Sequence, residues 1–434
     1  MHNNISFLLK GLRGISEEIG IISHTVKLPR FHSDPSILNY GIWPSDTTQI
    51  NGEKFEGRSG ASGVEWTSAI LSTLGETFER YAPAFFPIEE AIKSSFNNLK
   101  KDAIEPSKYA LFHPKQYEYY QKVNYNLYPF ANDLEVTWVP GYNLINGKEV
   151  YIPAQFIYMP FKKDKKFITA GNSTGLASHT NFYAAILTGL YEVIERDSFV
   201  MTWMNNLVPD KIIISDEIKT FLDERFPAHY EWHFFDITYD LKMPTTFGIC
   251  KGRTEFGDFV AVGSATRGTF GDSLRRVIME IGQTVPYFRW LLGEREEWKP
   301  DDDFNKILSF SDHSIFYLKR KDLWHVFDNW TNKEPSKNIY FNEEKKLSIT
   351  EEIKQILNVF KNKQYNVVFK NISTPDIRQL GYHSIKIFVP ELLQLSGGYP
   401  FYFSGGKRLY EVPRKLFGIN NTYETLNKFP HPFP

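Results

Sequence analysis

The chain has 434 residues, of which 42% are hydrophobic and 23% are charged, and its formal net charge is −1. This composition is that of a globular protein with a large core, and the near-neutral charge argues against nucleic-acid binding driven by phosphate neutralisation. A single cysteine, Cys250, excludes an intrachain disulfide and a thiolate metal cluster, and its apolar neighbours predict a buried structural thiol.

The N-terminal segment, residues 1–55, carries no recognisable targeting signal. Its one short apolar run is followed closely by charges, which matches neither a signal peptide nor a membrane span. Residues 5–22 are compatible with a helix, and residues 24–56 read as irregular or short-stranded chain. We therefore expect a cytoplasmic protein that makes no membrane contact.

A Gly/Ser-rich turn at residues 57–63 precedes the first of three similar helical patterns. This pattern runs over residues 68–86 and should end at Pro83 or Pro87, because proline breaks a helix. Its carboxylates are three residues apart, which places them on one face of the helix. The polar residues of the pattern are Ser72, Glu76, Glu79 and Arg80.

Residues 88–133 mix Lys, Asn and Tyr with short helical stretches, and we expect a peripheral insertion there. Residues 136–159 hold β-branched runs on either side of Asn146-Gly147, a dipeptide that favours a tight hairpin turn. A β-hairpin is therefore predicted around these two residues.

The second and longest helical pattern lies within residues 170–200, after another Gly/Ser-rich turn. Nearly every face of this helix is apolar, which is typical of a buried helix. Glu192, Glu195 and Arg196 nevertheless share one face, and ionised carboxylates are rarely buried unless they are paired or bound to a cation. Taken alone, the helix supports two interpretations: carboxylates directed at a positive ligand, or an ordinary salt bridge between Glu192 and Arg196.

A third helix follows the glycine-rich segment 263–271 and places Arg276, Glu280 and Gln283 on one stripe. Strands are expected before and after it, with one short helix among them. The strands are predicted at residues 211–214, 231–236, 245–250, 259–262, 367–370 and 384–389, and the short helix at residues 217–224.

The three helices repeat one arrangement, a glycine-rich entry followed by carboxylate, arginine or amide groups on one face. This repetition favours a shared ligand over independent salt bridges. Convergent carboxylates suit Mg2+, which takes oxygen ligands and bridges to phosphates, and glycine-rich helix entries offer backbone N–H groups to an anion. Together these features predict a nucleotide–magnesium site.

The remaining segments carry weaker signals. Within residues 294–364, the segments 294–303 and 332–346 are charged and solvated, and we attach no chemistry to them. Lys407 and Arg408, in a glycine-rich aromatic stretch, are either exposed loop charges or phosphate contacts. The chain has no Walker A sequence and no H-E-x-x-H. Because the three motifs span residues 57–283, one large mixed α/β domain is favoured over several small ones.

The chain ends in FPHPFP, with prolines at positions 430, 432 and 434. Alternating prolines bias a segment towards an extended polyproline conformation, so a stiff arm carries the terminal carboxylate. A disordered tail is the ordinary alternative for an end of this composition.

The three helical motifs, together with the segment FDITYDLKMP (235–244), resemble the ATP-binding motifs of the YcaO family, in the same order and over roughly residues 55–400. The alternating prolines resemble the end of its azoline-forming branch, the D protein of thiazole/oxazole-modified peptide pathways of the streptolysin S type. The resemblance implies one YcaO-type domain, residues 56–413, of mixed sheets and buried helices around an ATP-binding cleft. It also implies a tail, residues 414–434, that enters the active site.

The activity implied by the resemblance is ATP-dependent cyclodehydration of a ribosomally made precursor peptide. A Cys, Ser or Thr side chain attacks the preceding carbonyl, ATP phosphorylates the amide oxygen, and loss of phosphate leaves a thiazoline or (methyl)oxazoline. The implied general base is the carboxylate of Pro434, whose reference pKa of about 3.5 makes it a weak base unless its surroundings raise it. The implied Mg2+ ligands are Glu76, Glu79, Glu192 and Glu195, and the implied ATP-binding residues are Ser72, Arg80, Arg196, Arg276, Glu280 and Gln283.

Two positions depart from the family pattern. The second family motif begins with Asn and Glu where this chain has Thr180 and Ala184, and Asn181 is one residue out of register. The basic residue often found in the first glycine-rich turn is also absent; Ser62 stands near its position, with Arg58 upstream. Either this branch uses another ligand or nucleotide binding is weakened, and the two complete Glu-x-x-Glu-Arg cores favour the first.

The resemblance also implies partners. About 55 residues precede the first motif, fewer than the peptide-clamp and E1-like region of fused cyclodehydratases. We therefore expect a separate E1-like protein that binds the leader of the precursor peptide. A flavin-dependent azoline dehydrogenase is a further candidate partner, and the family often forms homodimers.

Two other functions remain open. Ala184 motivates a catalytically weak scaffold that holds a modification complex together. A thioamide-forming relative would use the same ATP chemistry with sulfide, although the proline-rich end argues against it. A di-iron carboxylate protein would need Glu-x-x-His pairs, which none of the three motif helices has.

Overall fold

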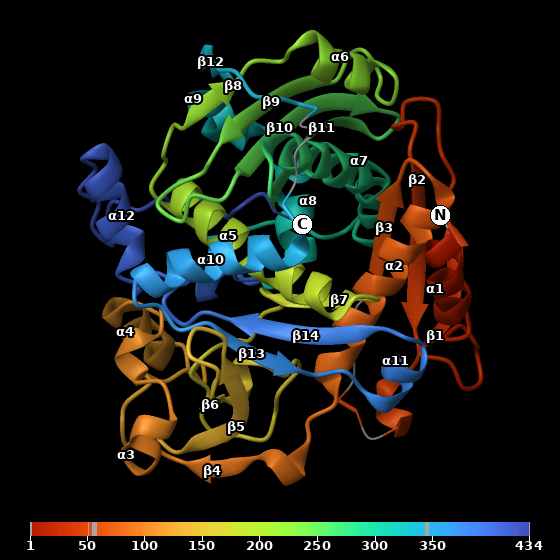
Figure 1. Cartoon of the computed structure of the whole chain (residues 1–434). Helices are drawn as coiled ribbons and strands as arrows, with labels where there is room; N and C mark the ends of the chain where they lie inside the picture. Colours follow the sequence, from red (N-terminus) through yellow and green to blue (C-terminus); the bar gives the residue numbers. More distant parts are fainter. Residues whose placement is uncertain (1, 51, 54–58, 343–346, 434) are drawn as a thin grey trace.

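Three β-sheets and the helices around them make up the structure, a computed structural model that describes residues 2–50, 52–53, 59–342 and 347–433 (Figure 1). Strands and helices are mixed along the chain, so the expected mixed α/β fold is confirmed. The helices are α1 (His2–Leu12), α2 (Trp66–Tyr81), α3 (Phe96–Leu99), α4 (Pro114–Lys122), α5 (Phe182–Met204), α6 (Asp216–Asp223), α7 (Phe270–Glu294), α8 (Phe310–Lys319), α9 (Asp328–Thr331), α10 (Ile349–Asn362), α11 (Pro375–Gln379) and α12 (Arg408–Phe417).

The first sheet contains the N-terminal strands and packs against α2. Its last strand lies where the sequence suggested a turn, and it leads directly into the first motif helix. A Cβ on Gly63 would lie only 2.8 Å from the backbone nitrogen of Ala69, so this close approach requires glycine. The strands, all antiparallel, are β1 (Ile22–Lys27), β2 (Leu38–Pro44) and β3 (Ser59–Gly63).

The second sheet has the order β11-β10-β9-β8-β12 and contains the strands predicted around residues 211–262. Helix α7 packs on it, and Cys250 is fully buried in its second strand, as predicted. The strands are β8 (Asp210–Ile212), β9 (Glu231–Asp236), β10 (Thr245–Thr254), β11 (Gly257–Thr266) and β12 (Pro335–Lys337), of which β12 pairs in parallel with β8.

The third sheet has the order β4-β5-β13-β14-β7, with β6 paired to β5. The predicted hairpin is confirmed, and Gly147 adopts a φ of 69° in its turn. The strands are β4 (Ile92–Ser94), β5 (Val136–Asn143), β6 (Lys148–Pro153), β7 (Leu176–His179), β13 (Val368–Asn371) and β14 (His383–Phe388).

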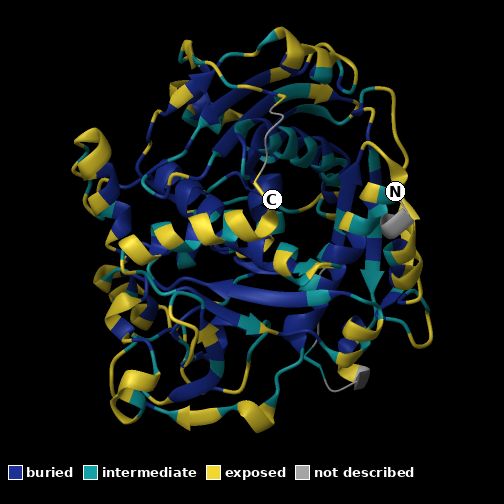
Figure 2. Cartoon of the chain, viewed as in Figure 1, coloured by how far each residue is buried: buried dark blue, intermediate teal, exposed yellow. Residues whose placement is uncertain are grey.

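Each motif helix follows a strand of a different sheet. Strand β3 leads into α2, β7 into α5 and β11 into α7, so each glycine-rich entry contains strand residues, and the second also contains a turn before β7. Helix α5 contacts strands of the second and third sheets and is buried along most of its length, as predicted (Figure 2). The three sheets therefore bring the motif helices together from distant parts of the chain.

The segment expected to be a peripheral insertion instead supplies core side chains, and so does part of the stretch to which we attach no chemistry. In residues 88–133, β4 extends the third sheet, and Tyr109 and Tyr120 are buried in the core cluster around that sheet. In residues 294–364, Tyr317 of α8 and Trp330 of α9 are buried beside α5. The prediction of a peripheral insertion was wrong because its aromatic residues are scattered among charged ones and show no helical or strand period.

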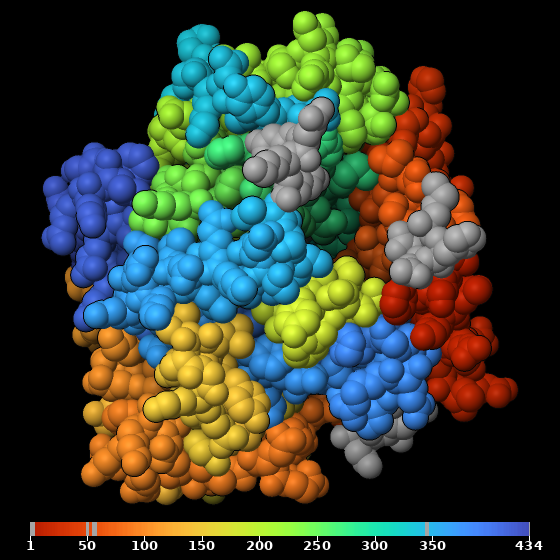
Figure 3. All heavy atoms as spheres, in the orientation of Figure 1, coloured from red at the N-terminus to blue at the C-terminus, as the bar shows by residue number. Residues whose placement is uncertain are grey.

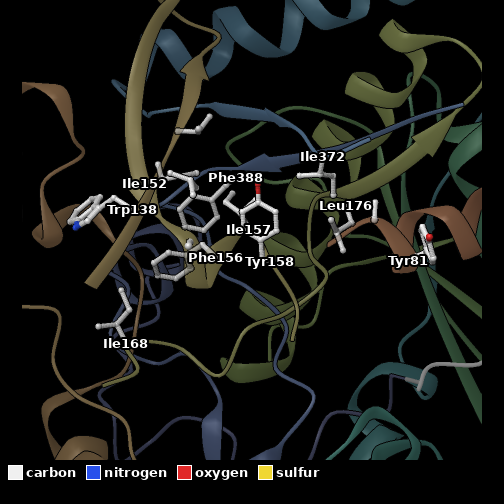
Figure 4. Close-up of a cluster of buried hydrophobic side chains, with 14 of the residues drawn as sticks. Tyr81, Trp138, Ile152, Phe156, Ile157, Tyr158, Ile168, Leu176, Ile372 and Phe388 are labelled. Carbon is white, nitrogen blue, oxygen red and sulfur yellow. The ribbon is translucent and has the colours of Figure 1, made fainter. Parts of the chain in front are cut away.

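The largest cluster of buried side chains lies between the third sheet and α2 (Figure 4). Trp138, Phe156 and Phe388 pack at one end of it, and Tyr81 of α2 lies at the other. Phe156 and Phe388 stack with their ring centroids 4.7 Å apart. This cluster fixes α2, and with it the first glutamate pair, against the third sheet.

In the part of the chain that the structure describes, no helix is long and apolar enough to cross a bilayer. The expected cytoplasmic location remains a prediction.

Arg408 does not face a phosphate site, because it is buried in an ion-pair network. Its guanidinium donates to Asp197 at 3.0 and 2.6 Å and to Asp240 at 2.9 Å through each of two nitrogens. Asp197 follows the second Glu-x-x-Glu-Arg motif directly, and Asp240 lies between β9 and β10. The network therefore ties α12 to α5, while neighbouring Lys407 is exposed.

Replacing Arg408 with Ala should lower the free energy of unfolding by about 3–5 kcal/mol, because buried Asp197 loses its counter-ion and half-buried Asp240 keeps only Lys363. Urea unfolding followed by circular dichroism measures this change. Arg414→Ala, at an exposed position of the same helix, is the matched control and should leave stability nearly unchanged. Equal stability of the two variants would contradict the assigned role of the network.

Candidate active site

A cavity of about 1330 Å³ opens between the first sheet, α2, α5 and α7. In the space-filling view, the dark green α7 lies recessed between the orange first sheet and the segments around it (Figure 3). The structure brings every expected metal- and ATP-binding residue to this cavity, and Pro434 lies outside the described residues. The expected residues lining the cavity are Ser72, Glu76, Glu79, Arg80, Glu192, Glu195, Arg196, Arg276, Glu280 and Gln283.

The glutamates of α2 and α5 face each other across the cavity. Glu195 is only 5% exposed, and burial raises its pKa to about 8. Burial likewise raises the pKa of Glu79 to about 8, and repulsion from Glu192 on the opposite helix adds to the shift. The pKa of Glu76 is also raised, mainly by burial. These carboxyl groups therefore repel one another across two helices, an arrangement that a bound cation would relieve.

Arginines are interleaved with the glutamates. The Nε of Arg196 lies 3.7 Å from Glu192 and 3.5 Å from Glu195, so one guanidinium is shared between two carboxylates. Glu192 also accepts a hydrogen bond from the backbone N–H of Gly175 at 3.0 Å. The simple salt-bridge interpretation of α5 is therefore incomplete, because Glu192 has other contacts and faces the glutamates of α2.

Helix α7 closes the third side of the cavity. Arg276 donates to Glu280 at 2.9 Å, on the stripe predicted from the sequence. Gln283 donates its side-chain amide to the carbonyl oxygen of Gly60 in β3. Gln283 thus joins α7 to the first sheet. Because its side-chain amide group makes this contact, its side-chain carbonyl oxygen is the group that could accept from a ligand.

The positions that depart from the family pattern are explained in part. Thr180 lines the cavity, whereas Asn181 caps α5 by accepting from the backbone nitrogen of Ala184 at 3.1 Å. Asn181 is therefore occupied as a helix cap and does not replace the missing carboxylate. Ser62 donates to the carbonyl of Met279 at 3.1 Å, and Arg58 lies outside the described residues.

Two basic residues near the glutamates were missed by the sequence reasoning. Lys386 of β14 is 1% exposed, donates to the carbonyl of Asn172 at 2.9 Å, and has a pKa lowered by burial to about 7. Arg267, just after β11, lines the cavity and lies over the ring of Tyr191 at 5.6 Å. Lys386 could have been found from the sequence, because it is the only lysine in the otherwise largely apolar strand of residues 383–388.

The far end of the cavity is aromatic. Rings from β2, from the segment before it, from the second half of α7 and from the start of α8 form its walls, and the rings of Tyr287 and Trp290 stack 5.7 Å apart. This end suits a flat base or a peptide side chain. Its aromatic residues are Phe31, Tyr40, Trp43, Tyr287, Trp290 and Phe310.

The side chains fit a magnesium ion that is shared with a nucleotide. Within residues 2–50, 52–53, 59–342 and 347–433, no three His, Cys, Asp or Glu side chains are grouped closely enough to hold a metal by themselves. Mg2+ is usually held by one or two carboxylates together with water and substrate phosphates. The buried, mutually repelling glutamates and the adjacent arginines have the chemistry that this arrangement needs.

The described part of the C-terminal tail reaches the same cavity. Phe433 is 3% exposed and lines it. The guanidinium carbon of Arg196 lies 4.8 Å from the centre of its ring.

A family model described as YcaO cyclodehydratase, ATP- and Mg2+-binding, matches residues 60–393 of this chain. The chain belongs to the YcaO family. The family description confirms the cofactors expected from the motifs, ATP and Mg2+. It also agrees with the resemblance drawn from the three helices, whose residues all fall inside the matched range.

Solved YcaO-type structures share the fold. A heterocyclase in complex with substrate and cofactor superposes with a TM-score of 0.77 and 21% identity, covering 99% of this chain and 57% of that one. YcaO from Methanopyrus kandleri, bound with AMPPCP and Mg2+, superposes with a TM-score of 0.60 and 14% identity, and the match covers 86% of each chain. A chain of the E. coli microcin synthetase McbBCD complex gives 0.57 and 16%, covering 85% of this chain and 88% of that one.

Among curated proteins, an uncharacterised protein of Methanothermobacter thermautotrophicus is 29% identical over 195 residues. The alignment covers 43% of this chain and 46% of that protein. The chain thus spans about half the length of this relative and of the heterocyclase.

The raised pKa values of Glu79 and Glu195 predict a pH dependence. Their folded-state pKa lies above the unfolded value, so the stability they contribute is present below about pH 4.5 and is lost as the pH rises through about 8. Mg2+ with ATP binds the ionised carboxylates, so the stabilisation that it gives should grow between pH 6 and pH 8. Its affinity should rise by up to about tenfold per pH unit for each proton that binding releases.

Thermal unfolding with and without Mg2+ and AMPPCP measures this dependence. The double variant Glu79→Gln/Glu195→Gln should fold and should lack the pH-dependent part of the ligand shift. A ligand shift that stays constant with pH in the wild-type protein would contradict the assignment.

Proposed function

We propose that this protein is an ATP-dependent cyclodehydratase that converts Cys, Ser or Thr residues of a ribosomally made precursor peptide into thiazoline or (methyl)oxazoline rings. The observation that carries the proposal is the meeting of the α2 and α5 glutamates in one cavity, which Phe433 of the proline-rich tail also lines. An ATP–magnesium site needs such convergent glutamates, and Phe433 brings the tail to the same cavity. In this proposal residues 1–55 are an N-terminal segment, residues 56–413 form the catalytic domain and residues 414–434 form the tail that enters the site.

Each group of cavity residues has a proposed role. Glu76, Glu79, Glu192 and Glu195 would hold Mg2+, and the cavity arginines would pair with phosphate oxygens through their paired N–H groups. ATP, when bound, supplies the phosphoryl group that makes the amide oxygen a good leaving group. Ser72, Glu280 and Gln283 complete the proposed nucleotide contacts, alongside Arg80, Arg196 and Arg276.

The attacking side chain needs a base. We assign this role to the terminal carboxylate of Pro434, which follows cavity-lining Phe433. A carboxylate with an ordinary pKa is a weak base for a thiol or hydroxyl, so the assignment requires surroundings that raise its pKa. Burial beside the cavity glutamates would raise that pKa, whereas the cavity arginines would oppose the rise.

Partners are proposed on the family pattern. A separate E1-like protein would bind the leader of the precursor peptide and deliver its core to this site. A flavin-dependent azoline dehydrogenase and a homodimer complete the proposed assembly. The heterocyclase solved with substrate and the microcin synthetase complex support a peptide substrate and partner proteins.

A catalytically weak docking scaffold is the second candidate. It is favoured by Ala184, which leaves one family carboxylate missing, and by the use of Asn181 as a helix cap. A thioamide-forming enzyme is the third candidate, and the mass of the product peptide distinguishes it from a cyclodehydratase.

The test combines the purified protein with a precursor peptide and its partner proteins. ATP should be consumed, and mass spectrometry should show the peptide losing one water for each ring formed. The variant Glu192→Gln/Glu195→Gln should lower ring formation by about 100-fold or more, because the groups that bind Mg2+ and organise the phosphates are lost.

Glu391→Gln is the matched control. Glu391 is also a carboxyl whose pKa is raised by burial, but it accepts hydrogen bonds from Asn366 outside the cavity, and its replacement should leave activity intact. Unchanged ring formation in the cavity variant would favour the scaffold, and exchange of oxygen for sulfur in the product would favour thioamide formation.

A further inference from the structure

The C-terminal tail is held through its backbone. Four consecutive carbonyl oxygens, of residues 428–431, each accept a hydrogen bond from the side chain of a different residue. Contacts to successive backbone atoms fix the register of an extended segment, because a slip by one residue would break all of them. The donors are Tyr399 to Lys428 at 2.5 Å, Trp203 to Phe429 at 3.0 Å, Tyr317 to Pro430 at 2.7 Å and His313 to His431 at 2.8 Å.

Two stacked histidines complete this anchor. The rings of His313 and His431 are 3.7 Å apart and 5° from parallel. His431 also meets the carbonyl of Ser396 at 2.8 Å. A carbonyl oxygen only accepts, so His313 carries its proton on Nδ1 and His431 on Nε2. Burial lowers the pKa of His313 to about 3 and that of His431 well below its usual value, so both rings are neutral and stack without charge repulsion.

The fixed register delivers Phe433 to Arg196. The ring of Phe433 meets Phe199 of α5 edge-on at 4.4 Å and has the guanidinium of Arg196 above it at 4.8 Å. The carboxylate contacts of Arg196, at 3.7 and 3.5 Å, are long for hydrogen bonds. The buried ring is therefore a principal support of this half-buried guanidinium, and cation–π contacts strengthen as water is excluded.

We propose that Phe433 is a positioning residue whose ring, delivered by the anchored tail, holds the guanidinium of Arg196 in place for the phosphates of ATP. The inference rests on the proposed placement of ATP in this cavity. It makes the tail a part of the nucleotide site through a side chain, independently of any role of the terminal carboxylate. Seating of the tail and binding of the nucleotide are then coupled, and each strengthens the other.

Calorimetric titration with Mg2+ and AMPPCP tests the proposal without requiring turnover. Phe433→Leu keeps an apolar side chain but removes the aromatic face, and it should weaken binding by about 5- to 10-fold. Phe433→Tyr keeps the face and should bind within about twofold of the wild type. Phe433→Met repeats the test if the leucine variant does not fold.

Phe429→Leu is the matched control on the same tail. The Phe429 ring lies 6.1 Å from that of Phe304 and 6.2 Å from that of His325, on the tail segment held by Trp203 rather than beside Arg196. This variant should bind Mg2+ and AMPPCP as the wild type does. Wild-type affinity in Phe433→Leu, or an equal loss in Phe429→Leu, would overturn the inference alone. Absence of binding by the wild-type protein would overturn the proposed nucleotide site and this inference with it.

Discussion

The structure depends on one electrostatic constraint: carboxyl groups from two helices are buried against each other in a single cavity. Burial favours their neutral form, and the raised pKa values of Glu79 and Glu195 are its consequence. Repulsion between Glu79 and Glu192 adds to the free-energy cost of ionising them. The cavity arginines relieve part of this repulsion, and a divalent cation would relieve the rest, so the cavity has the charges needed to bind Mg2+ with a nucleotide.

The fold explains how distant segments meet this constraint. The motif helices α2, α5 and α7 each follow a strand from a different sheet, and the central helix α5 contacts two of the sheets. Polar contacts hold the arrangement, among them the buried ion pair of Arg408 with Asp197 and the half-buried hydrogen bond of Gln283 to Gly60. The site is therefore assembled by the whole domain, with the glutamates on helices rather than on mobile loops.

The sequence predicted the site more fully than it predicted its surroundings. Glu76, Glu79, Glu192 and Glu195 were found because helical spacing alone puts each pair on one face. Lys386 and Arg267 were missed, since a single basic residue in or after a strand has no repeating partner to reveal its direction. The phosphate contact suggested for Arg408 was wrong because its partners, Asp197 and Asp240, lie far from it in sequence. The anchoring of the tail by Tyr317 and His313 was invisible for the same reason.

The most direct test of this account is a crystal structure of the protein with Mn2+ in place of Mg2+ and with AMPPCP, in which anomalous scattering locates the metal. The account predicts Mn2+ between the α2 and α5 glutamates, bridging them to the phosphates, with the guanidinium of Arg196 still resting on the ring of Phe433. Metal and phosphates located outside this cavity, or a cavity that stays empty at saturating nucleotide, would contradict it.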